Sequence, residues 1–106
     1  MSDLKWTETE QKIASEALQK AYEREMDSLI KEVRHQASSL EKLDDIWHLH
    51  DFLSARRHEI DGKYDFRDSV LIFVFARLVK EGWLDLDRLD GLDRDKITKI
   101  SALARM

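Results

Sequence analysis

The sequence predicts an all-α protein with long helices, and three observations support that prediction. The chain of 106 residues contains no proline and three glycines, so little in it would interrupt a helix. Thr7 and Glu10 form a Thr-x-x-Glu capping box, which is typical of the start of a helix. Apolar side chains then recur at helical steps of three and four residues, at Tyr22, Met26, Leu29, Val33, Ala37 and Leu40. Ile13, Ala17 and Ala21 extend this stripe upstream with smaller side chains.

This long first helix cannot bury its apolar stripe alone, so it needs either a later part of the chain or a second copy as partner. Ser38 and Glu41 form a second capping box. We therefore expect the helix to break or kink near Ser38 and Ser39 before a second helix begins. That second helix should run to Gly62, where a left-handed glycine would end it.

The C-terminal part of the chain reads as a group of shorter helices. Asp65 is expected to cap a helix over residues 67–81, which Gly82 ends. Its centre, residues 70–76, is apolar on all sides and is compatible with a buried strand, but the length and the glycine stop favour a buried helix. A short helical turn over residues 86–89 and a final helix capped by Asp93 should follow.

Together these elements predict one all-α domain over residues 1–106. Residues 1–62 would form a long helical stem, and a domain this small often gains stability by oligomerising, because it buries a modest fraction of its surface. Residues 63–106 would form a small helical head.

Composition excludes several functional classes. The chain has no cysteine, so it has neither disulfides nor thiolate metal sites. Its net charge is −4 with both signs interspersed, which does not favour nucleic-acid binding. The polar start of the chain predicts no signal peptide, and the longest apolar run is far below the roughly 18 residues of a membrane span. We therefore expect a cytoplasmic protein.

The segment from Leu43 to Tyr64 carries two different stripes when it is placed on a helix. One stripe is apolar and reads as ordinary core: Ile46, Leu49, Leu53 and Ile60. The neighbouring stripe mixes an aromatic ring, imidazoles, a hydroxyl, a carboxylate and a guanidinium: Trp47, His50, Asp51, Ser54, Arg57 and His58. A core rarely needs such a mixture, so the second stripe is the candidate functional surface.

Spacing argues against metal and catalytic chemistry in this segment. His48 and His50 point to different faces, and His58 lies two turns from His50, so no metal site is expected. Ser54, His50 and Asp51 could suggest a hydrolytic triad, but nothing nearby supplies an oxyanion hole. The aspartates after Asp85 do not match the ligand positions of a calcium loop.

A protein-binding surface remains. Tryptophan and arginine are the residue types most enriched at binding hot spots. Asp51 and Arg57 are six residues apart, so each should meet a group on another chain rather than pair within the helix. The alternative is that Trp47 belongs to the core of its own chain and Arg57 is a solvated charge. The pattern alone favours neither interpretation.

Three strings resemble the cyanobacterial fluorescence recovery protein family: WHLHDFLSARRHEIDGKYD at residues 47–65, SVLIFVFARL at 69–78, and the ending ISALARM. The resemblance runs from about Ala17 to the C-terminus and implies an all-α homodimer with a compact head. It also implies a regulator, not an enzyme, that has no cofactor of its own and does not bind pigment directly. Its partner would be the photoactivated red form of the orange carotenoid protein, chiefly the C-terminal domain of that protein.

The resemblance further implies roles for six residues. Trp47 and His50 would lie at or near the dimer interface, while Asp51 and Arg57 would be needed for activity. In the head, Phe73 and Lys99 would contact the partner. The protein would speed the return of the carotenoid protein to its orange form and help to detach it from the phycobilisome, which restores antenna fluorescence. It would act in the cytoplasm, either free or associated peripherally with the cytoplasmic side of the thylakoid membrane. A helical dimeric adaptor for an unrelated protein is the alternative function.

Overall fold

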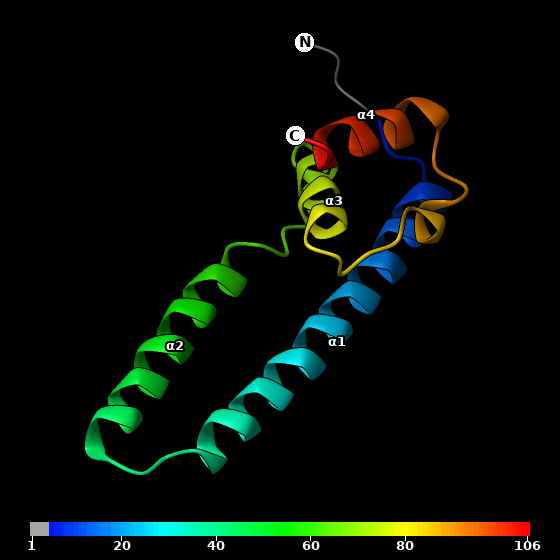
Figure 1. Cartoon of the computed structure of the whole chain (residues 1–106). Coiled ribbons are helices and arrows are strands. Elements are labelled where there is room, and N and C mark those ends of the chain that lie inside the picture. The colour runs from blue at the N-terminus through cyan, green and yellow to red at the C-terminus, as the bar shows by residue number, and fades with distance from the viewer. Residues whose placement is uncertain (1–4) are drawn as a thin grey trace.

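The computed structural model describes residues 5–106, and helices make up the regular elements of that part of the chain (Figure 1). This confirms the predicted all-α class. In chain order the elements are α1 (Glu8–Ser38), α2 (Leu43–Asp61), α3 (Leu71–Lys80), the 3-10 helix η1 (Leu86–Leu89) and α4 (Arg94–Ala104).

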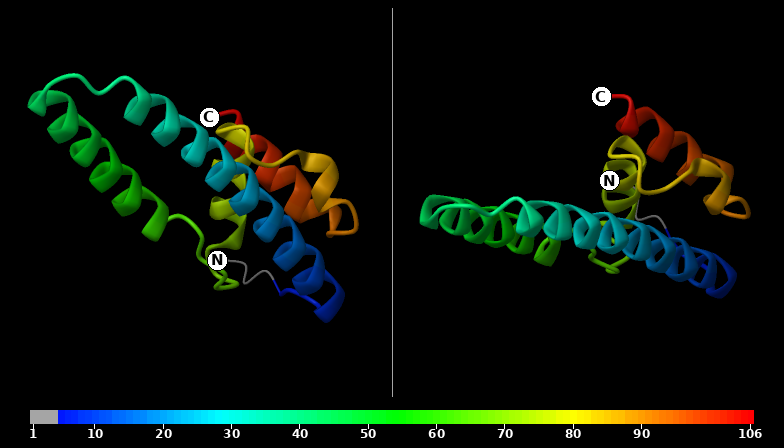
Figure 2. Two further views of the ribbon diagram at one scale, coloured as in Figure 1. Left: turned by 90° about the horizontal axis from the view of Figure 1, so that it is seen from below. Right: turned by 60° about the horizontal axis from the view of Figure 1, so that its bottom comes forward.

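The long helices α1 and α2 lie side by side as an antiparallel hairpin, and α3, η1 and α4 gather against the first half of α1 (Figures 1 and 2). The described chain measures 53 × 25 × 24 Å, with a radius of gyration of 16.7 Å. A compact chain of this length would have a radius of gyration of about 13 Å. The far half of the hairpin therefore extends away from the head, without cover from it.

Helix α1 begins as the sequence predicts. The Thr7 hydroxyl accepts a hydrogen bond from the backbone N–H of Glu10 at 3.1 Å, and the Glu10 carboxylate accepts one from the N–H of Thr7 at 3.1 Å. Each bond satisfies a backbone donor that would otherwise lack a partner in the first turn. The capping box is therefore confirmed.

The break between the two long helices is real, but the predicted cap is wrong. Ser38 is the last residue of α1, and its hydroxyl donates to the carbonyl of His35 at 2.8 Å rather than capping a new helix. Helix α2 is capped by Asp45, whose carboxylate accepts from the backbone N–H groups of Glu41 and Lys42 at 3.0 and 3.1 Å. The acceptor thus lies inside the new helix, and the restart falls later than the serine pattern predicts.

The connection from α2 to α3 also differs from the prediction. Gly62 follows α2 with a φ of −96°, so the left-handed conformation predicted for it is wrong. Asp65 does not cap α3, because its carboxylate binds the guanidinium of Arg67 at 2.6 Å and α3 starts later, at Leu71. Gly82, in contrast, has a φ of +86° and ends α3 as expected, since a side chain would be strained there.

The core lies between the head and the first half of α1. The α1 contribution is a stripe of buried alanines, which lets the head helices approach closely: Ala14, Ala17 and Ala21. Ala17 and Ala21, in the upstream part of the predicted stripe, therefore lie in the core. The larger residues of that stripe, farther along α1, do not belong to it; Tyr22, the first of them, is 41% exposed. Periodicity identified an apolar face of α1. The head packs against a neighbouring face of α1, and it covers only the first half of that helix. The residues packed against the alanines include Leu71, Phe75, Leu78, Leu89 and Ile100.

A buried ion pair joins the start of α1 to α4. Lys96 donates to the Glu10 carboxylate at 2.8 Å, and its ammonium also lies 4.9 Å from the centre of the Trp6 ring. The backbone N–H of Asp93, the residue before α4, donates to the second oxygen of Glu10 at 2.8 Å. Asp93 therefore precedes α4 as predicted, but its own side chain makes no capping hydrogen bond.

This pair predicts an acid-sensitive contribution to stability. Burial alone would raise the pKa of Glu10, but hydrogen bonds from Lys96, Asp93 and Thr7 outweigh it and lower the pKa from 4.5 to about 2. A lowered pKa stabilises the fold fully above the unfolded value and loses that stabilisation as the pH falls toward the folded value. The stabilisation should therefore disappear between pH 4.5 and pH 2.

We predict that Glu10→Gln removes this contribution. The difference in unfolding free energy between the wild-type chain and the variant should be largest above pH 4.5 and shrink by about 2–3 kcal/mol on acidification. Urea unfolding across this pH range measures it. Glu8→Gln, which changes an exposed glutamate in the same helical turn, is the matched control. Identical pH profiles for the wild-type chain and Glu10→Gln would contradict the prediction.

Candidate functional site

The apolar stripe of α2 is not part of the core of its own chain. No residue of Leu43–Asp61 is buried, and Ile46 is 47% exposed. The prediction that this stripe forms ordinary core is therefore wrong for the single chain. The physical reason is that the head covers α1 and leaves the outer faces of the hairpin uncovered. A helical period shows that a face is apolar, but not which molecule covers it.

Three of the predicted site residues come together on one turn of α2. Trp47 is 54% exposed, and its ring meets that of His50 edge to face, with ring centres 6.5 Å apart. The Nδ1 atom of His50 lies 3.4 Å from a carboxylate oxygen of Asp51, and both side chains are exposed. An aromatic surface and a polar group are thus presented side by side to solvent, which is a common composition of protein-binding surfaces.

Arg57 lies six residues after Asp51, about 9 Å farther along the axis of α2. Its guanidinium is 3.8 Å from the carboxylate of Asp61, and its side chain is 86% exposed. As predicted, it does not pair with Asp51, because Asp51 is with His50 instead. A long, exposed ion pair holds a side chain weakly, so Arg57 is available to an external carboxylate. We call Trp47, His50, Asp51 and Arg57 the stem patch.

The two predicted site residues of the head are also exposed. Phe73 is 62% exposed, although its neighbours Ile72 and Val74 are buried, so α3 is not buried all round as its apolar sequence predicted. Lys99 is exposed on α4. We call Phe73 and Lys99 the head pair. The stem patch lies on α2, Phe73 on α3 and Lys99 on α4.

Two cavities in the described part of the chain lie away from the stem patch. A cavity of about 580 Å³ is lined by α1 residues 13–23 together with Arg88 and Asp90, and one of about 270 Å³ by α1, Tyr64 and Phe66. Neither is lined by a residue of α2. Within residues 5–106, no cluster of three or more carboxylate and histidine side chains could hold a metal ion, and no helix is long and apolar enough to cross a membrane.

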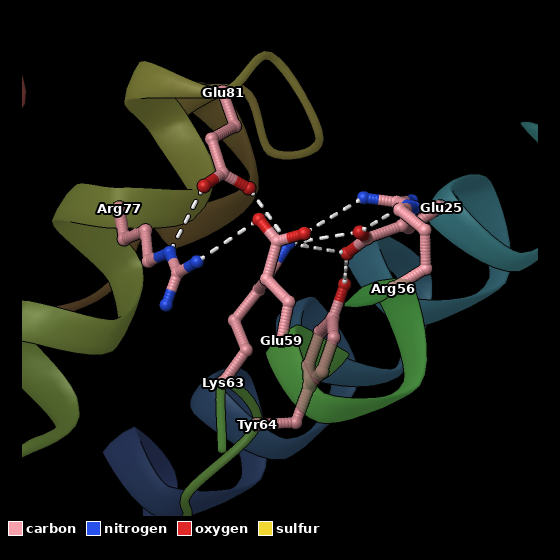
Figure 3. Close-up of polar contacts among 7 residues, drawn as sticks. All are labelled: Glu25, Arg56, Glu59, Lys63, Tyr64, Arg77 and Glu81. Carbon is pink, nitrogen blue, oxygen red and sulfur yellow. Dashed lines mark hydrogen bonds and ion pairs between the residues drawn. The ribbon is translucent and has the colours of Figure 1, made fainter. Parts of the chain in front are cut away.

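A group of charged residues that the sequence did not reveal lies where α1, the end of α2 and α3 meet (Figure 3). Six side chains of alternating charge form a closed ring of ion pairs, each 2.7–3.2 Å long. In order around the ring they are Glu25, Arg56, Glu59, Arg77, Glu81 and Lys63, and the last closes on the first. The ring holds three carboxylates and three cations, so it is neutral.

Two carboxylates of the ring, Glu25 and Glu81, have pKa values below their usual range. Burial opposes the ionisation of Glu25, but hydrogen bonds from Lys63 and Tyr64, with the charges of Lys63 and Arg56, hold its pKa below the usual range. Burial likewise opposes the ionisation of Glu81, whose pKa is nevertheless lowered by Lys63 and Arg77. The Tyr64 hydroxyl donates to Glu25, and burial together with this bond raises the pKa of the tyrosine.

These features define an all-helical protein that presents aromatic and charged patches on open helix surfaces, as a regulator acting through protein contacts would. Residues 6–104 match the family model described as photoprotection regulator fluorescence recovery protein. The chain therefore belongs to the fluorescence recovery protein family, as the sequence resemblance predicted.

Individual relatives agree with this assignment. A fluorescence recovery protein of Synechocystis sp. PCC 6803 is 54% identical over 101 residues, which cover 95% of this chain and 93% of that protein. The solved structure of the Fremyella diplosiphon fluorescence recovery protein is 61% identical and superimposes with a TM-score of 0.93. That of the Synechocystis protein is 54% identical, also with a TM-score of 0.93. Both alignments cover 96% of this chain and 100% of the solved chain.

Proposed function

We propose that this chain binds the photoactivated red form of the orange carotenoid protein, chiefly at its C-terminal domain, and accelerates its return to the orange form. It thereby helps to detach the carotenoid protein from the phycobilisome and restores antenna fluorescence. The activity takes place in the cytoplasm, at or near the cytoplasmic face of the thylakoid membrane. The observation that carries this proposal is the exposed stem patch, in a chain that belongs to the fluorescence recovery protein family.

The mechanism is a change in populations and barriers rather than a chemical reaction. A binding protein moves a conformational equilibrium, or lowers the barrier between two states, only by binding one state or the transition between them more tightly. Light drives the forward step, so the regulator need only accelerate relaxation. Asp51 and Arg57, together with the head pair, hold the separated C-terminal domain in a pose from which it re-docks. The chain needs no cofactor and no pigment of its own for this role.

The functional unit in this proposal is a homodimer. Ile46, Trp47 and Leu53 are large apolar side chains that stay 39–54% exposed in the single chain. An uncovered apolar stripe on a long helix is the surface that a second copy would bury. Trp47 and His50 would then lie at the interface, with Asp51 and Arg57 beside it.

Trp47→Ala should shift the dimer toward monomer. Loss of the indole removes apolar area twice in a symmetric interface, so we expect the dissociation constant to rise at least about 100-fold. Light scattering over a dilution series measures the mass. Phe66→Ala, which removes another exposed aromatic side chain, should leave the mass unchanged. A Trp47→Ala variant that keeps the mass of a dimer at low concentration would count against this role.

Binding to the two states of the carotenoid protein tests the proposed function against its alternative. The chain, immobilised, is offered the carotenoid protein under strong blue-green light and in darkness. Retention that is stronger under illumination supports the proposal. Binding to neither form would leave the alternative, a dimeric helical adaptor for an unrelated protein.

A further inference from the structure

Charged side chains link α2 to α1 and to the head helix α3. No side chain of α2 is buried within the chain. Within residues 5–106, the hydrogen bonds and ion pairs that join α2 to α1 and α3 run through two of its residues, Arg56 and Glu59. Arg56 binds Glu25 of α1 at 3.1 Å, and Glu59 binds Arg77 of α3 at 3.2 Å. Both contacts belong to the ring of six ion-paired side chains.

The ring has one buried side and one exposed side. The side chains of Glu25 and Lys63 are fully buried, and Glu25 also accepts the hydroxyl of Tyr64. This side anchors the α2–α3 connection to α1, because an ion pair in a dry site cannot exchange its partner for water without a large cost. On the opposite side, Glu59 and Arg77 are 37% and 43% exposed. Their contact is thus reached by solvent, whereas the Glu25–Lys63 contact is not.

Figure 3 shows how this exposed contact links α2 to α3: Glu59 extends from α2, Arg77 extends from α3, and a dashed line joins the two side chains. Each of the two is also tied within its own helix, Glu59 to Arg56 and Arg77 to Glu81. These local pairs direct Glu59 and Arg77 toward the space between the two helices, which lowers the entropy cost of their contact. Helix α2 carries the stem patch, and α3 carries Phe73 of the head pair.

We propose that Glu59 and Arg77 are positioning residues, which hold the stem patch and the head pair at the relative angle that the partner protein requires. The proposal rests on the function proposed above, since that function is what would use both surfaces together. Neither residue needs to touch the partner. Opening of their contact would leave α2 joined to α1 through Arg56 and Glu25 but no longer joined to α3, so the angle between α2 and the head could change while each helix stays folded.

Spin-label distances test, without the partner, whether the Glu59–Arg77 contact sets the angle between α2 and the head. The chain contains no cysteine, so Ala55→Cys on α2 and Ala102→Cys on α4 give two unique label sites, both exposed. Labelled chains are mixed with an excess of unlabelled chains, so that distances within one chain are measured. We expect one narrow distance for the wild-type background and a broadened distribution for Glu59→Gln and for Arg77→Gln. The double variant should be no broader than the broader single variant, because both remove the same contact.

The same substitutions, without labels, are then tested for dark recovery of the carotenoid protein. An exposed ion pair supplies enough energy for a fall of about two- to fivefold in the acceleration. The matched control is the double variant Lys20→Gln, Glu23→Gln, which removes an exposed pair of 3.8 Å within α1 and should change neither readout.

Several outcomes would overturn the proposal. An unchanged distance in all ring variants would show that the contact does not set the angle. A loss of activity with an unchanged distance would show that Glu59 or Arg77 contacts the partner directly, and a loss of thermal stability alone would make the pair merely structural. If the wild-type chain itself does not accelerate recovery, the proposed function fails, and the positioning role in recovery fails with it. Broadened distances in the ring variants would in that case still show that the Glu59–Arg77 contact sets the angle between α2 and the head.

Discussion

Arg57→Leu is expected to remove most of the acceleration of dark recovery, with a fall of at least about tenfold, while the fold and the dimer persist. Within residues 5–106 the guanidinium has one ion pair, 3.8 Å long and exposed, so the unfolding free energy should change little. A charged hydrogen-bonding group that meets its partner in a desolvated interface is worth far more, because its removal leaves the other charge unpaired. The recovery of the carotenoid protein's absorbance after illumination measures the effect.

Arg34→Leu is the matched control, since it removes an exposed arginine from α1. Circular dichroism and light scattering should match the wild-type chain for both variants. A recovery rate for Arg57→Leu equal to that of the wild-type chain would show that Arg57 has no part in the activity.

Lys63→Met should cause the largest loss of stability among the ring substitutions. The Lys63 ammonium binds Glu25 at 2.8 Å and Glu81 at 2.7 Å, and its side chain is fully buried. Removal of one partner of a buried ion pair leaves an uncompensated carboxylate and costs about 3–5 kcal/mol. In a domain of this size, such a loss lowers the melting temperature by about 12 °C or more. Urea and thermal unfolding at pH 7 measure it.

The double variant Glu25→Leu, Lys63→Met separates this explanation from a simple loss of packing. Because it removes both buried charges, it should be more stable than Lys63→Met alone. Lys20→Met, which changes an exposed lysine of α1, should stay within about 0.5 kcal/mol of the wild-type chain. A Lys63→Met variant with wild-type stability would rule out the buried anchor.

Local signals made much of the fold predictable from sequence. The capping box at Thr7 and Glu10 and the stop at Gly82 depend on residues close together in the chain, and both are present. The restart of α2 was misplaced because two capping patterns compete near Ser38, and the chain uses Asp45. The choice depends on side-chain geometry that residue types alone do not specify.

The buried ring was missed because its partners are far apart in sequence. Glu25 and Lys63 are separated by 38 residues, and spacing cannot pair them. One signal was available: Glu25 continues the stripe of Ala14, Ala17 and Ala21 at helical spacing. A carboxylate in line with buried small residues predicts a buried cation opposite it. Glu10 lies at the other end of the same stripe and binds Lys96 in the same way.

The roles of the six site residues, and the choice of Phe73 and Lys99, came from family resemblance, whereas helical spacing alone had already placed the four stem residues on a candidate surface. Periodicity separated the mixed stripe of α2 from its apolar stripe, and the structure shows that both are open to solvent in the single chain. Whether Trp47 meets a second copy and Arg57 meets a partner depends on molecules outside the chain. Contacts with another protein are absent from the intrachain pattern that sequence analysis reads.

The most direct test of the proposed function is the dark recovery of purified orange carotenoid protein. The protein is converted to its red form by strong light, the light is turned off, and the return of the orange absorbance is followed with and without this chain. The proposal predicts a recovery rate that rises with the concentration of the chain and then saturates. A rate equal to that of the carotenoid protein alone, at every concentration of the folded chain, would contradict it.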